Sequence, residues 1–139
     1  MKRYKTLFIE NERQSLESER LNIDLDIIQN KRIFIIAKIK ESDLNWLTKS
    51  TKDKPVVEGT LDIEPNFIYL NRVDSFAKGK SYAKEVLEVV LQWVKHKYHK
   101  NLARGYIENS NFSSQDMIKK LGGKKVEEKE HGSYWEIKL

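Results

Sequence analysis

The sequence predicts one α/β domain, and three observations carry this prediction. Most apolar residues fall in short runs typical of strands, a long amphipathic helical pattern spans residues 80–99, and a turn of small residues joins a strand-like run to that helix. A strand followed by a helix and another strand is typical of mixed α/β chains. At 139 residues the chain fits a single domain, predicted here over residues 1–139.

The amino-acid composition excludes several classes of protein but does not identify the binding partner. Basic residues outnumber acidic ones by 26 to 21, a net charge of +5 that suits a polyanionic small molecule as well as nucleic acid. The absence of cysteine excludes disulfides, thiolate nucleophiles and cysteine-bound metals. No apolar run approaches the roughly 20 residues that span a bilayer, and no signal-peptide core follows the basic N-terminus. We therefore expect a cytoplasmic protein that contacts no membrane.

The N-terminal half is expected to be rich in strands. Residues 4–9 predict a short strand, and residues 11–20 a polar connection with helical character. Alternation at 22–27 and the apolar run at 33–39 flank turn-forming residues, which predicts a hairpin. Ser42 is expected to cap a short helix carrying Leu44, Trp46 and Leu47. Residues 56–63 and 66–73 predict two more strands.

The C-terminal half combines helices and strands. The residues expected to face inward from the helix at 80–99 are Ala83, Val86, Leu87, Val90 and Val94. Residues 102–108 predict a strand, and 124–129 with 133–139 predict a closing hairpin. Between them, Ser113 and Asp116 are similar to a capping box that opens a short helix, which Gly122 is expected to end. The strand–helix–strand unit is where a ligand crevice should lie.

The turn before the long helix has the chemistry of a phosphate site. The N–H groups that open a helix lack intrahelical partners, and the helix dipole favours an anion beside them. Gly79, Ser81 and Ala83 are small enough to let a ligand reach these groups, and Lys78 and Lys80 add positive charge. The sequence therefore predicts a pyrophosphate site here. The alternative is that Gly79 only forms a turn and the lysines are only solvated.

This turn and a later segment resemble motifs A and B of the GNAT superfamily of acyl-CoA N-acyltransferases. Motif A reads Gln/Arg-x-x-Gly-x-Gly/Ala, where this chain has Lys78-x-x-Ser81-x-Ala83, so lysine and serine depart from the pattern. Motif B reads close to Asn-x-x-Ser/Ala-x-x-Leu-Tyr-x-Lys-x-Gly-Phe, and the similar segment is Asn111-x-x-Ser114-x-x-Met117-Ile118-x-Lys120-Leu121-Gly122. The resemblance covers residues 67–139. The usual pair of helices between the first two strands is not found.

The resemblance implies a fold and a reaction. The fold would be a mixed, mostly antiparallel sheet with a splayed strand pair and helices on both faces. Residues 1–65 would form a divergent acceptor-side half and residues 66–139 the cofactor-binding half. The activity implied is N-acetyl transfer from acetyl-CoA to an amine, either a small molecule or a protein, by direct attack of the amine on the thioester.

The resemblance also implies which residues bind the cosubstrate. The backbone around Arg72 and Val73 would hold the pantetheine arm, the amides of residues 79–83 the pyrophosphate, and the Asn111 side chain the pantetheine. The implied cofactor-binding residues are Arg72, Val73, Lys78, Gly79, Lys80, Ser81, Tyr82, Ala83 and Asn111.

The catalytic groups stay unassigned. Many family members carry a tyrosine as general acid where this chain has Ile118, which cannot donate a proton. Tyr69, Tyr106 and Tyr134 are candidate replacements, although aromatic residues in strands more often serve packing. Glu108 is either a general base or a solvated strand end. No metal site is predicted, because His96 and His99 lack a third ligand nearby.

Two other interpretations remain open. The first is a non-catalytic protein that uses the GNAT fold to recognise a protein or nucleic acid. The second is a basic nucleic-acid-binding module built on Lys95, Lys97 and Lys100, with Trp93 and Tyr98 interleaved. Nucleic acid is the less favoured partner. The acceptor, the acyl-chain length and association into a homodimer are left open.

Overall fold

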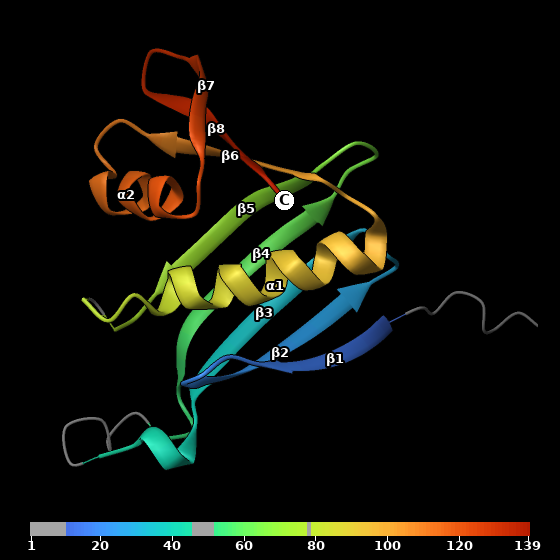
Figure 1. The fold of residues 1–139 in the computed structure, drawn as a ribbon, viewed down its shortest axis with the longest axis vertical. Coiled ribbons are helices and arrows are strands. Elements are labelled where there is room, and N and C mark those ends of the chain that lie inside the picture. The colour runs from blue at the N-terminus through green and yellow to red at the C-terminus, as the bar shows by residue number, and fades with distance from the viewer. Residues whose placement is uncertain (1–10, 46–51, 78) are drawn as a thin grey trace, which may run out of the picture.

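The computed structural model describes residues 11–45, 52–77 and 79–139 of the chain. In these ranges it forms an eight-stranded sheet with two α-helices (Figure 1). The strand order is β1-β2-β3-β4-β5-β6-β8-β7, and every neighbouring pair is antiparallel except β5 and β6. The predicted mixed, mostly antiparallel sheet is therefore confirmed.

The strands of the first half differ from the prediction in one place. β1 (Asn11–Glu17) occupies the segment for which we predicted a connection with helical character, and that prediction is wrong. Pairing with β2 (Leu21–Ile28) overrides the polar composition, since a partly exposed strand at the sheet edge tolerates polar residues on both sides. β2 and β3 (Arg32–Ile39) form the predicted hairpin. The predicted strand at residues 4–9 lies outside the described residues.

The short helix expected from Ser42 is only partly described. The chain forms a single 3-10 turn, η2 (Glu41–Asp43), with Ser42 inside it rather than at its cap. Trp46 and Leu47 lie outside the described residues. β4 (Pro55–Ile63) and β5 (Ile68–Ser75) then confirm the next two predicted strands.

The hydrophobic core lies between one face of the sheet and the helices. Strand alternation puts Ile23 of β2 and Ile35 of β3 on this face, both almost fully buried. α1 (Tyr82–Tyr98) covers it with Val86, Leu87, Val90, Leu91 and Val94, which confirms the predicted apolar stripe except that Ala83 is half-buried. α2 (Phe112–Lys120) contacts α1 and packs beside β6 (Leu102–Glu108) and β8 (Gly132–Lys138) (Figure 1).

The opposite face of the sheet carries no α-helix within the ranges that the structure describes. Phe34 and Ile36 of β3 point to this face and are 42% and 41% exposed. The connection between β1 and β2 consists only of residues 18–20, which is too short for the pair of helices that the family resemblance implies. Helix cover in the described part of the chain is therefore on one face, although the resemblance led us to expect it on both.

β5 and β6 splay apart and so position the site. They pair only from Ile68 to Leu70 on β5, after which both strands continue without pairing to each other. A bulge against β4 leaves Asn71 as an extra residue on β5 at this point, which bends the strand. Gly105 faces Leu70 at the last pair, where a methyl group would lie 3.2 Å from the Leu70 Cβ. The splayed strand pair is confirmed.

The C-terminal hairpin closes the sheet beyond the splay. β7 (Lys124–Glu128) pairs with β8, and β8 pairs with β6 along its whole length. Both strands fall where they were predicted. Neither of the helices in the described ranges is long and apolar enough to cross a membrane.

Candidate functional site

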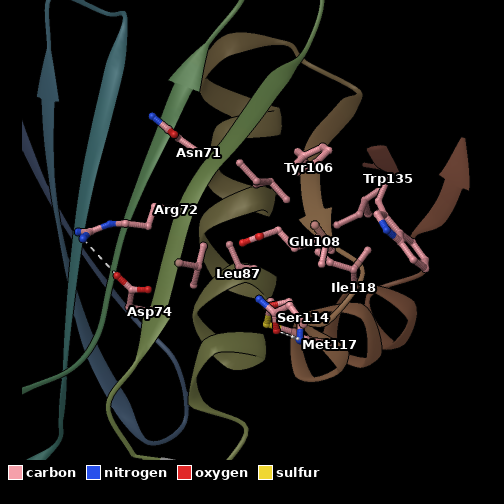
Figure 2. A pocket seen from close by; sticks show the side chains of 16 residues that line it. Asn71, Arg72, Asp74, Leu87, Tyr106, Glu108, Ser114, Met117, Ile118 and Trp135 are labelled. Carbon is pink, nitrogen blue, oxygen red and sulfur yellow. Dashed lines mark hydrogen bonds and ion pairs between the residues drawn. The ribbon is translucent and has the colours of Figure 1, made fainter. Parts of the chain in front are cut away.

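The wedge between β5 and β6 holds a pocket of about 380 Å³ (Figure 2). It draws its walls from both strands, both helices and β8. Its apolar wall is made by Leu70, Leu87, Ile107, Met117, Ile118, Trp135 and Ile137. Its polar groups belong to Asn71, Arg72, Asp74, Tyr106, Glu108, Asn111 and Ser114. A concave site that combines an apolar wall with several polar groups is the usual form of a small-molecule site.

Of the three charged residues that line the pocket, two direct their side chains away from it and one directs its side chain into it. Arg72 and Asp74 form an ion pair of 3.2 Å between Nη1 and Oδ2, and Figure 2 shows both side chains directed away from the pocket interior. Arg72 therefore presents its backbone to the pocket, whereas Val73, which alternates with Arg72 and Asp74 along β5, packs its side chain against the core. Glu108, the last residue of β6, directs its carboxylate into the pocket (Figure 2). In the described part of the chain no cation or hydrogen-bond donor engages that carboxylate.

The three tyrosines considered as proton donors do not meet in the pocket. Only Tyr106 lines it; its ring packs edge-on against Tyr134, with centroids 5.2 Å apart. A methyl group at Gly132 of β8 would lie 2.6 Å from the Tyr106 hydroxyl, so this hydroxyl lies over β8, on the side of β6 away from β5. Burial raises the pKa of Tyr69, and the nearby Tyr134 raises it further. These positions favour packing roles.

α2 contributes an apolar wall at the position where the family resemblance would place a tyrosine as general acid. Ile118 is 4% exposed and lines the pocket, so this position supplies no proton. The helix is capped by Asn111, whose Oδ1 accepts from the Ser114 N–H at 3.1 Å. The predicted capping box at Ser113 is therefore wrong, because Ser113 already lies within the helix. The same bond leaves the Asn111 amide nitrogen as the donor that this side chain can offer to the pocket.

The turn before α1 leaves N–H groups without partners. Gly79 and Ser81 both adopt left-handed backbone, with φ of 77° and 59°. The first bond of the helix runs from the Glu85 N–H to the Ser81 carbonyl at 3.1 Å. Within the described ranges no hydrogen bond engages the N–H groups of Ala83 and Lys84. They point along the helix axis toward the turn, as an anion site requires. Lys78 lies outside the described residues.

The turn lies beyond the wide end of the pocket rather than in its wall. Residues 79–83 do not line the pocket, whereas Arg72, Val73 and Asn111 do. Leu87 of α1 does line it, and a rise of about 1.5 Å per residue places Ala83 about 6 Å further toward the N-terminus of the helix. The fold thus brings three of the predicted residues together and sets the turn next to them. The Tyr82 side chain is 5% exposed, so this residue can offer only its backbone.

Ser81 stands in a conformation that glycine adopts without cost. A left-handed serine costs on the order of 1 kcal/mol, and the Ser81 side chain makes no capping hydrogen bond in return. We expect Ser81→Gly to raise the free energy of unfolding by about 0.5–1 kcal/mol, and Ser81→Ala to leave it nearly unchanged. Urea denaturation of the three proteins measures this. A stabilised alanine variant would show that the backbone is not the cause.

The two histidines that were considered as metal ligands lie at the C-terminal end of α1, and neither lines the pocket. His96 is in the last turn of α1 and His99 caps its C-terminal end with a φ of 56°. Across residues 11–45, 52–77 and 79–139, no three histidine, aspartate or glutamate side chains gather as metal ligands would.

Several of the solved structures that match this fold are described as N-acetyltransferases. The PaiA N-acetyltransferase from Thermoplasma acidophilum, in complex with coenzyme A, matches with a TM-score of 0.63 at 18% identity over 78% of this chain and 62% of its own. The Campylobacter jejuni N-acetyltransferase PseH, in complex with acetyl coenzyme A, gives 0.62 at 8% identity over 80% and 70%. FdhC, described as a nucleotide-linked sugar GNAT, gives 0.60 at 14% identity over 78% and 58%.

The likeness is one of fold. No protein-family model matches the sequence, and no curated protein matches it either. The chain spans 62% of the length of the Thermoplasma protein and 70% of the Campylobacter one. With its splayed β5–β6 pair, α1 crossover and mostly antiparallel sheet, the chain has the fold of the GNAT N-acetyltransferases.

Proposed function

We propose that this protein binds acetyl-CoA in the β5–β6 wedge and transfers the acetyl group to an amine acceptor by direct attack. The observation that carries the proposal is that the pocket and the N-terminus of α1 lie next to each other. A wedge-shaped pocket has strand backbone along one wall, and a helix N-terminus with unpaired N–H groups lies at its wide end. An elongated ligand with a diphosphate at one end suits both features together.

The chain supplies different groups to the different parts of such a ligand. The turn at residues 79–83 would hold the diphosphate through its N–H groups, helped by the charge of Lys78 and Lys80. The β5 backbone at Arg72 and Val73, and the Asn111 amide nitrogen, would hydrogen-bond the pantetheine amides. The reactive thioester would then lie near the closed end of the wedge, where Leu70 and Gly105 pair.

The reaction needs few groups from the protein. The neutral amine forms the new C–N bond, the C–S bond breaks, and the electron pair leaves on the CoA sulfur. The proton released by the amine needs an acceptor, and Glu108 is the free carboxylate directed into the pocket. A thiol has a pKa near 8.5, so the sulfur can leave as a thiolate without a general acid. The isoleucine at position 118 is compatible with such a step.

Thiol release tests the catalytic part of the proposal. Purified protein is mixed with acetyl-CoA and each member of a panel of primary amines and lysine-bearing peptides, and free CoA thiol is followed with a chromogenic disulfide. We expect release that depends on both acetyl-CoA and one class of amine. Release that is no faster than with heat-denatured protein, across the whole panel, would contradict transfer.

A second function is favoured by two observations. Ile118 removes the usual acid, and the sheet face that carries Phe34 and Ile36 is left open by the described helices. Both suit a protein that uses the fold, with or without CoA, to recognise a protein or a nucleic acid. This function predicts acetyl-CoA binding without thiol release, or no acetyl-CoA binding at all.

A further inference from the structure

We propose that Arg20 and Glu85 are positioning residues for the diphosphate of the acyl donor, because they fix the peptide unit that opens α1. This inference rests on the proposed function. It assigns a role to the β1–β2 turn, which is distant in sequence from the helix and lies outside the segment that resembles the family motifs.

The contacts of the two side chains converge on the turn. The Arg20 Nε donates to Glu85 Oε1 at 2.8 Å, and the Arg20 backbone N–H donates to Glu85 Oε2 at 3.0 Å. The Ser18 hydroxyl donates to the same Oε2 at 2.5 Å. The Nη2 of the guanidinium lies 2.7 Å from Glu85 Oε1 and also donates to the carbonyl oxygen of Lys80 at 2.8 Å. One arginine therefore joins the β1–β2 turn, the first turn of α1 and the predicted phosphate turn.

The hydrogen bond from Arg20 to the Lys80 carbonyl determines where the N–H of Ser81 points. The carbonyl of Lys80 and the N–H of Ser81 belong to one planar trans peptide, so they point in opposite directions. Arg20 holds the carbonyl from one side and thereby aims the Ser81 N–H to the other side. Accepting a hydrogen bond also polarises the peptide and strengthens its N–H as a donor.

Glu85 keeps Arg20 in place and balances its charge. Burial raises the pKa of Glu85, but the hydrogen bonds from Ser18 and from the backbone and side chain of Arg20 outweigh it, so this pKa lies below its ordinary value of 4.5. The guanidinium also stacks 4.5 Å from the centre of the Tyr82 ring, which is buried beneath it. The pair is thus fixed from three directions before any ligand binds.

Positioning and simple attraction make opposite predictions for Glu85. If Arg20 acted on the diphosphate only through its charge, Glu85→Gln would free that charge and tighten acetyl-CoA binding. If the pair acts by orienting the peptide, Glu85→Gln loosens Arg20 and weakens binding, as Arg20→Met does. We expect both variants to bind acetyl-CoA about tenfold more weakly, the cost of a hydrogen bond to a charged group.

The experiment compares two acyl donors on folded protein. Amide NMR titrations with acetyl-CoA and with S-acetyl-pantetheine, which lacks the diphosphate, give dissociation constants and report directly on the Ser81 amide. The matched control is Glu12→Gln, because the Lys97–Glu12 ion pair of 3.0 Å also ties α1 to β1 but lies at the other end of the helix. We expect the control to bind both donors as the wild type does.

The expected outcome is a loss confined to acetyl-CoA in the Arg20 and Glu85 variants, with S-acetyl-pantetheine unaffected and the Ser81 amide resonance displaced in the free protein. Tighter acetyl-CoA binding by Glu85→Gln, or equal losses for the two donors, would overturn the positioning role alone. Failure of the wild type to bind either donor would overturn the proposed function and this inference with it.

Discussion

Glu108→Gln is expected to lower the turnover number for amine acetylation by a factor on the order of 100 to 10,000, the usual contribution of a general base. The amide keeps the size of the side chain and its place in the pocket, but it cannot accept the amine proton. Because the proposed donor contacts come from the α1 turn, the β5 backbone and Asn111, the affinity for acetyl-CoA should stay within about twofold of the wild type. A thiol-release assay measures the turnover number, and calorimetry measures the affinity for acetyl-CoA.

The matched control is Asp116→Asn, which removes one carboxylate from the exposed side of α2, outside the pocket. It should leave turnover unchanged. A Glu108→Gln protein that turns over at the wild-type rate would show that water, rather than Glu108, takes the proton.

Gly79→Glu is expected to weaken acetyl-CoA binding by a factor on the order of 100 or more. Gly79 lies in the turn before α1 with a φ of 77°, and a side chain at this position would meet open space rather than protein. A carboxylate at this place would face the diphosphate, and like charges near 4 Å repel by about 4 kcal/mol at an effective dielectric constant near 20. Calorimetric titration of the variant measures the loss.

Gly122→Glu provides a close control for this change. Gly122 has a φ of 87°, a side chain there would also meet open space, and it ends α2 rather than opening α1. The two variants therefore share the charge change and the cost of a left-handed glutamate, about 1–2 kcal/mol of stability. Equal losses of acetyl-CoA affinity in both would trace the effect to stability and would argue against a phosphate site at Gly79.

Most of the fold could be predicted because the hydrophobic periodicity of the sequence is clear in elements that bury a single face. The apolar stripe of α1 and the alternation of β2 and β3 each bury one face, and periodicity specifies such faces well. β1 was missed because its residues are polar, and only pairing with β2 makes them a strand. The N-cap of α2 was misplaced by two residues, since Asn111, Ser113 and Ser114 are all plausible caps.

The candidate site was predictable only in part. Gly79 and Ser81 could be picked out because a turn of small residues before a helix is a local feature of the sequence, and Asn111 because it stands in the segment that resembles motif B. The pocket depends on the splay of β5 from β6, which only the family resemblance implied, and the bulge at Asn71 beside it has no local sequence signal. Arg20 was missed for a similar reason: its partners, Lys80 and Glu85, are brought near it only by the tertiary fold.

Acetyl-CoA binding by the wild-type protein is the claim on which the rest depends, and isothermal titration calorimetry measures it most directly. We expect saturable heat with one site per chain, abolished by Gly79→Glu and retained by Gly122→Glu. No binding heat from folded wild-type protein, at several temperatures and at the highest attainable concentration, would contradict an acyl-CoA site between β5 and β6.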